Sequence, residues 1–183
     1  MDKLLGGQMV VFNRLEPGAD TMPFHKLARA ANRRIDILYD FTDGTTAFDD
    51  IVDPLPFDIN APVIEVKDED FALWYRDVTE EPEKYSGKVV EFKGQVALLR
   101  RTKENMFAPG RFVMTRCADD IQFCGIPCSY AGAAKLEPRS WIMLKARISA
   151  EKHPLYKGEV GPVLTAISVK TGAIPADPDV ATF

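Results

Sequence analysis

Apolar and polar residues alternate in the stretch Val89-Val90-Glu91-Phe92-Lys93-Gly94-Gln95-Val96-Ala97-Leu98. A period of two predicts a half-buried β-strand, because successive side chains of a strand point to opposite faces. The residues expected to face a core are the apolar members Val90, Phe92, Val96 and Leu98. Gly94 lies in the middle of the stretch and indicates a bulge or a sharp coil, the device by which a small barrel closes.

Four more strands are predicted after this one, at residues 112–117, 121–130, 141–148 and 163–169. The turn Ala118-Asp119-Asp120 joins the second and third strands as a hairpin, and residues 130–136 form a short helix or turn before the fourth. This order predicts a mainly β protein (α+β overall) built on an OB-fold-like five-stranded antiparallel barrel. A generic five-stranded antiparallel sheet is the alternative.

The residues before the barrel predict a small α/β extension. A strand at residues 10–12, a helix that begins near Thr21 and a strand at residues 35–41 follow one another. Pro54, Pro56 and Pro62 then prevent regular structure, because proline removes a backbone donor and forces its predecessor to be extended. We therefore predict an N-terminal extension with an acidic connector over residues 1–56, and a barrel domain with a leading helix over residues 57–183. That leading helix presents a core-facing stripe, Phe71, Trp74, Tyr75 and Val78.

Composition and charge predict a soluble globular chain, cytoplasmic or peripheral at the cell membrane. The 183 residues are 46% hydrophobic and 27% charged, with a net charge of −4, which is close to the globular average. Residues 36–70 hold eleven acidic residues and one basic residue. No apolar run approaches the ~18 residues that span a bilayer, and the N-terminus does not resemble a signal peptide. Three cysteines are too few for a disulfide framework and fit a reducing compartment.

The sequence contains no pattern that predicts an enzyme. It has neither a P-loop nor a dinucleotide-binding fingerprint, and no paired carboxylates typical of a hydrolase. The two histidines, His25 and His153, have no evident Ser or Cys partner, so we expect both on the surface. The chain is therefore predicted to be non-enzymatic.

A metal site is one alternative, formed by Cys117, Cys124 and Cys128 with Asp119 and Asp120 beside them. Thiolates and carboxylates bind zinc, although the spacings are not the short Cys-x-x-Cys spacing of zinc knuckles. If Cys124 and Cys128 share one strand they lie on one face, and Cys117 lies opposite Cys124 across the hairpin. Small cysteines that fill a barrel core are the other interpretation. No cofactor is predicted apart from zinc through these thiols.

Binding of single-stranded nucleic acid is a further alternative, because OB barrels present aromatic residues and a basic groove for stacked bases. The aromatic candidates are Phe107, Phe112, Phe123 and Tyr130, and the nearby basic residues are Arg100, Arg101, Lys103, Arg111 and Arg116. Arg111 and Arg116 can equally be solvent-facing residues of an ordinary strand, so the case for nucleic acid is not strong. The candidate residues for binding a ligand or partner are Arg111, Arg116, Asp119, Asp120, Phe123 and Tyr130.

The segment from Arg111 to Tyr130 also carries a family resemblance. With Tyr85-Ser86-Gly87-Lys88, Trp141 and Gly161-Pro162-Val163-Leu164, it resembles the family of predicted two-component membrane permease complex subunits, whose C-terminal domain has no known function. The resemblance covers about residues 57–183. It implies an OB-like accessory domain that binds a predicted membrane permease subunit, with a role in transport or metal homeostasis, and it implies no catalytic residue. The chain departs from the family in lacking membrane-spanning helices and in having Arg116-Cys117 where the family has paired cysteines.

Overall fold

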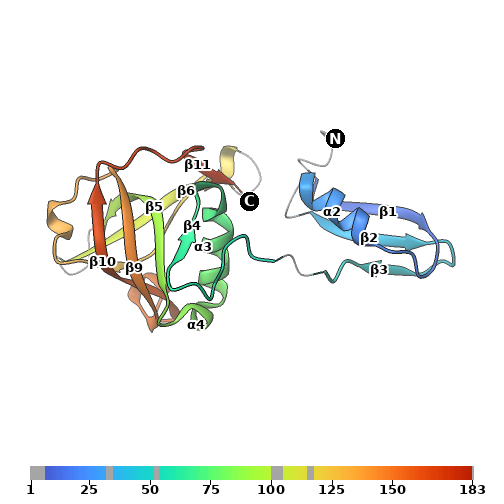
Figure 1. Ribbon diagram of the computed structural model, residues 1–183, viewed down its shortest axis with the longest axis horizontal. Coiled ribbons are helices and arrows are strands. Elements are labelled where there is room, and N and C mark those ends of the chain that lie inside the picture. Colours follow the sequence, from blue (N-terminus) through green and yellow to red (C-terminus); the bar gives the residue numbers. More distant parts are fainter. Residues whose placement is uncertain (1–6, 32–34, 52–53, 100–104, 115–117, 183) are drawn as a thin grey trace. The chain divides into compact units, whose positions relative to one another are not determined.

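The computed structural model describes residues 7–31, 35–51, 54–99, 105–114 and 118–182, and these fall into two compact units. One unit comprises the described residues up to Pro54, and the other comprises Leu55–Thr182. Each unit has its own sheet (Figure 1). In the described part of the chain no helix is long and apolar enough to cross a bilayer.

The first unit is a three-stranded sheet with one helix. Its elements are β1 (Met9–Leu15), α2 (Met22–Ala31), β2 (Asp36–Phe41) and β3 (Thr46–Phe48). β1 and β2 are parallel and are joined by α2, and β3 is antiparallel to β2. The core is made by Ala28, Ile35, Ile37 and Tyr39, with Val10, Phe12, Leu15, Phe24 and Phe41 packed against it. The small α/β extension predicted from the sequence is confirmed.

The prediction that His25 lies on the surface is wrong. His25 is only 4% exposed, and its Nδ1 lies 2.8 Å from Oδ2 of the buried Asp49. Tyr39 donates a hydrogen bond of 2.7 Å to the other oxygen of this carboxylate. These partners compensate for burial of the imidazole, so His25 faces inward while Leu27 of the same helix is 46% exposed.

The second unit is mainly β. Its elements are β4 (Ile64–Val66), η1 (Asp68–Asp70), α3 (Phe71–Glu80), α4 (Pro82–Tyr85), β5 (Val89–Leu98), β6 (Met106–Met114), η2 (Ala118–Asp120), β7 (Gln122–Gly125), β8 (Cys128–Ser129), η3 (Ala133–Lys135), β9 (Trp141–Lys152), η4 (Pro154–Tyr156), β10 (Val160–Thr171) and β11 (Val180–Thr182). The elements denoted η are short 3₁₀ helices.

Strand pairing closes this strongly curled sheet into a ring. β5 pairs with β6 and β9, β9 pairs with β10, β10 pairs with β8, and β8 returns to β6. The β8–β10 pairing is parallel and the other four are antiparallel. In chain order η3 lies between β8 and β9, the third and fourth strands of the ring. The OB-like order of elements predicted from the sequence is therefore confirmed.

The alternating pattern of β5 correctly predicts the burial of Val90, Phe92 and Val96, but the prediction that Leu98 faces the core is wrong. Val90, Phe92 and Val96 are at most 2% exposed, whereas Leu98 at the end of the strand is 47% exposed. A Cβ on Gly94 would lie 3.2 Å from the backbone N and O of Gly110 on β6. Close approach of these two strands is therefore what favours glycine here.

The leading helix is core-facing, as its sequence predicts. Phe71, Trp74 and Val78 of α3 are at most 1% exposed. The Trp74 ring packs against the Phe92 ring of β5 with centroids 4.8 Å apart. This contact attaches α3 to the curled sheet.

Three features of the second unit differ from prediction. The second strand of the barrel, β6, begins at Met106 rather than at residue 112. The third strand is split into β7 and β8, because Pro127 between them has no backbone N–H and its carbonyl accepts from Leu164 instead. The C-terminal segment, where the sequence predicts no strand after residues 163–169, is held in place. Ala176 and Ala181 are buried, and β11 pairs in parallel with residues 112–114 of β6.

Candidate functional site

Arg111 lies in the interior, and the expectation that it faces solvent is wrong. Its side chain is completely buried. Nη1 donates to the carbonyl of Asp68 at 2.6 Å, and Nη2 donates to the carbonyl of Pro178. Its Nε is buried without a hydrogen-bond partner among the described residues. Because its acceptors belong to η1 and to the C-terminal segment, Arg111 joins both of these to β6.

Two aromatic rings flank the Arg111 guanidinium. Its Cζ lies 5.4 Å from the ring centroid of Phe71 and 5.9 Å from that of Trp141, within cation–π range. Burial lowers the pKa of Arg111, and the carboxylates of Asp68 and Asp179 act in the opposite direction. Asp68 is itself held by Lys93, whose Nζ lies 2.7 Å from Oδ2. This arrangement stabilises the fold and leaves the Arg111 guanidinium out of reach of solvent.

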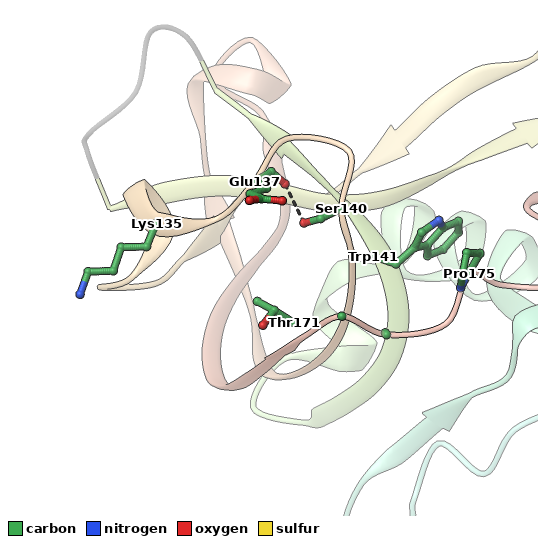
Figure 2. A pocket seen from close by; sticks show the side chains of 8 residues that line it. Lys135, Glu137, Ser140, Trp141, Thr171 and Pro175 are labelled. Atoms are coloured by element: carbon green, nitrogen blue, oxygen red, sulfur yellow. Dashed lines mark hydrogen bonds between the residues drawn. The ribbon is translucent and has the colours of Figure 1, made fainter.

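A pocket of about 430 Å³ lies beside Trp141 (Figure 2). It is lined by Lys135, Glu137, Ser140, Trp141, Thr171, Gly172, Ala173 and Pro175. The Ser140 hydroxyl donates to the carbonyl of Glu137 at 2.7 Å, and the amide of Ala173 donates to the carbonyl of Trp141. The pocket therefore combines an aromatic wall with mixed polar groups, and its volume is within the range of small-ligand sites.

A second feature is an apolar row that crosses three strands. In the registered pairs, Phe112 of β6 lies opposite Phe123 of β7 on one side and opposite Val180 of β11 on the other. The rings of Phe112 and Phe123 meet edge to face, with centroids 5.4 Å apart. Phe112 is 40% exposed and Ile121, at the start of the β7 segment, is 38% exposed. We call Phe112, Ile121, Phe123 and Val180 the β6–β7 surface.

Acidic residues border this surface. Asp119 and Asp120 form the end of η2, directly before Ile121, and both are exposed. β7 pairs with β6 alone among the strands that the structure describes. The region thus combines exposed aromatic side chains, a strand edge and carboxylates, and it contains three of the six residues predicted to bind a ligand or partner.

The comparisons with known proteins bear on these features. A family model described as the DUF1980 C-terminal domain matches residues 47–180, which is more than half of the chain. The chain belongs to this family. No curated protein matches it. Among solved structures, the aspartyl-tRNA synthetase from Entamoeba histolytica is similar with a TM-score of 0.32 and 12% identity, over 49% of this chain and 19% of the synthetase. The chain thus spans about a fifth of that structure's length.

The two described cysteines of this DUF1980 C-terminal domain, Cys124 and Cys128, do not share a strand. Cys124 of β7 lies opposite Arg111, and Cys128 of β8 lies opposite Phe107. Cys117, predicted to lie opposite Cys124, is outside the described residues. The two partners on β6 are four residues apart, which is roughly 13 Å along a strand. Within the described ranges no cluster of three or more His, Cys, Asp or Glu side chains could hold a metal ion.

Burial also favours the protonated form of both described thiols. It raises the pKa of Cys128 to about 12. It raises the pKa of Cys124 as well, while a hydrogen bond with Tyr75 acts in the opposite direction. Since the thiolate is the metal-binding form, both positions resemble core cysteines. Cys117 lies outside the described residues, so zinc binding through it stays a prediction.

The other predicted site residues are separated from one another. The half-buried Tyr130 follows β8 and meets the ring of Phe107 at 6.2 Å, away from Phe123 on β7. The basic residues Arg100, Arg101, Lys103 and Arg116 lie outside the described residues. Sequence reasoning missed Asp68 and Pro178 as partners of Arg111, and it missed the pocket beside Trp141.

Proposed function

We propose that this DUF1980 C-terminal domain is a non-enzymatic binding module that docks on a protein partner through the β6–β7 surface. The partner is the predicted membrane permease subunit that the family resemblance implies, and the chain is its accessory subunit in transport or metal homeostasis. The observation that carries the proposal is the apolar row of Phe112, Phe123 and Val180, which crosses three strands and stays partly exposed.

Exposed apolar clusters with a polar border are typical of protein interaction sites. Aromatic side chains at the centre of such a cluster supply much of the binding energy when a partner excludes water from them. Among the described strands β7 pairs with β6 alone, and an edge of this kind offers backbone groups that a partner strand can bind. Together these features fit a protein partner that contributes apolar side chains.

The chemistry of the buried groups supports a binding role over catalysis. Burial raises the pKa of Tyr85 and Tyr156, and each hydroxyl donates within the fold, to Asp77 and to the carbonyl of Pro162 respectively. These shifted groups stabilise the domain and do not line the pocket beside Trp141. Their shifts follow from burial and from hydrogen bonds within the fold, as in structural networks.

The acidic border favours a protein partner over single-stranded nucleic acid. Phe112 and Phe123 offer a stacking surface of the kind that binds bases. Asp119 and Asp120 stand directly before Ile121, however, and carboxylates repel phosphates. Arg111, the candidate cation of this strand, is fully buried.

The test measures binding of the purified chain to the predicted permease subunit, reconstituted in lipid nanodiscs. We expect Phe112→Asp and Ile121→Asp each to weaken binding at least tenfold, because both place a charge in the apolar row. Ile167→Asp is the matched control, since Ile167 is 53% exposed on β10. Circular dichroism checks that each variant is folded. Absence of binding by the folded wild type, or equal affinities of all variants, contradicts the proposal.

A further inference from the structure

The three-stranded sheet of the first unit has one face that its helix does not cover. Val10, Phe12, Ile37 and Tyr39 belong to the core that includes Phe24 and Ala28 of α2. Side chains of a strand alternate between faces, so the intervening residues of the same strands point the other way. Those residues include Met9, Val11, Leu38 and Phe48, which we call the open sheet face.

The open sheet face is apolar and aligned. Val11 of β1 is registered with Leu38 of β2, and Leu38 with Phe48 of β3. Phe48 is 68% exposed, Met9 48% and Val11 47%, and Leu38 between them is half-buried. Parallel strands are almost always covered on both faces, so this row has the character of an interface. Three strands at ~4.8 Å spacing make it roughly 10 Å wide, about the diameter of one helix.

Charge on the central strand indicates what kind of helix fits. Asp36 and Asp40 are two residues before and two residues after Leu38, so both lie on the open sheet face. A second copy of this chain would bring carboxylates against carboxylates, which disfavours self-association. A helix with basic residues at both ends of an apolar stripe brings opposite charges together.

We infer that the open sheet face docks a basic amphipathic helix of a partner protein. Asp36 and Asp40 are roughly 13 Å apart along the strand. The same-face spacing of a helix closest to this is seven or eight residues, about 11–12 Å at 1.5 Å per residue. The partner helix therefore carries two Lys or Arg residues seven or eight positions apart, with apolar residues between them that pack on Val11, Leu38 and Phe48.

The test uses the full chain and fluorescein-labelled 18-residue helical peptides. One peptide has Leu residues at i, i+3 and i+4 between two Lys residues seven positions apart, and the matched peptide has Glu in place of both Lys. Fluorescence anisotropy at low salt is expected to show at least fivefold tighter binding of the Lys peptide. Phe48→Ser is expected to weaken that binding at least fivefold, and D36N/D40N is expected to abolish the preference for Lys over Glu.

Leu27→Ser is the control variant, because Leu27 is 46% exposed on α2 rather than on the open sheet face. It is expected to leave both affinities unchanged. Equal binding of the two peptides, or binding that Phe48→Ser does not alter, overturns the inference. The inference is also overturned if the wild type sediments as a dimer and Phe48→Ser sediments as a monomer, because a second copy of the chain then covers the open sheet face.

Discussion

Replacement of Arg111 by methionine is expected to destabilise the second unit by about 3–5 kcal/mol. A hydrogen bond from a charged donor contributes roughly 1.5–3 kcal/mol, and Arg111 makes two of them, to the carbonyls of Asp68 and Pro178. Methionine keeps an apolar stem between the rings of Phe71 and Trp141, so little packing is lost. Both carbonyls lose a charged donor, and because the two bonds are partly buried their loss is the larger part of the cost.

Urea denaturation followed by tryptophan fluorescence measures this change, because both tryptophans, Trp74 and Trp141, lie in the second unit. The control is Arg147→Ala, since Arg147 is exposed and donates one hydrogen bond of 3.0 Å to the carbonyl of Gly87. We expect this variant to lose less than about 1 kcal/mol of unfolding free energy. Amide exchange at Val180–Thr182 is expected to accelerate in Arg111→Met. A loss below about 1 kcal/mol, with exchange unchanged there, refutes the role given to Arg111.

Three further predictions concern the core. The free energy of unfolding is expected to fall as pH rises above about 9. Burial raises the pKa of Cys128 and of Tyr75 to about 12 in the folded protein, so these groups lose their protons at lower pH in the unfolded chain than in the folded one. A urea midpoint that is higher at pH 10.5 than at pH 8 contradicts this. The Cys128 thiol is expected to resist iodoacetamide at pH 8 in native protein and to react in urea, as peptide mass spectrometry can measure; alkylation at equal rates in both states is the opposing result. Gly110→Ala is expected to cost about 2–3 kcal/mol, because the new Cβ would lie 2.2 Å from the carbonyl oxygen of Cys124. Gly172→Ala, where φ is +73° with nothing within 4 Å, is the control at about 1–2 kcal/mol, and equal losses would contradict a steric cause.

The alternation of apolar residues made much of the barrel predictable. Alternation along the predicted strand at residues 141–148 puts Ile142, Leu144, Ala146 and Ile148 on one face. All four are fully buried, because a strand in a closed sheet presents one face to the core. The order of segments around η3 followed from turn residues and strand spacing. The parallel closure between β8 and β10 could not be predicted, since it depends on how far the sheet curls.

The position of Arg111 was misjudged although the sequence contains a signal for it. Arg111 has the same strand parity as Phe107 and Val113, both at most 1% exposed, so the strand pattern is compatible with its burial. A charged residue there was assigned to solvent because its acceptors were unknown. These are the backbone carbonyls of Asp68 and Pro178, 43 and 67 residues away, and carbonyls have no sequence signature.

The exposed residues of the site were only partly predictable. Phe123 was a candidate because aromatic residues are common on OB strands, but its pairing with Phe112 depends on the register of β6 with β7. The pocket beside Trp141 depends on where residues 171–175 run after β10. Local sequence patterns do not predict the register between two strands or the path of the chain after a strand.

Hydrogen exchange of the full chain, alone and bound to the predicted permease subunit in nanodiscs, tests the docking role of the second unit most directly. Slower amide exchange on binding at Gln122–Gly125, with little change at the outer residues of β10 around Ile167, is the result that a contact through strand β7 predicts. Unchanged exchange at Gln122–Gly125 together with protection centred on β10 would show that the partner binds elsewhere.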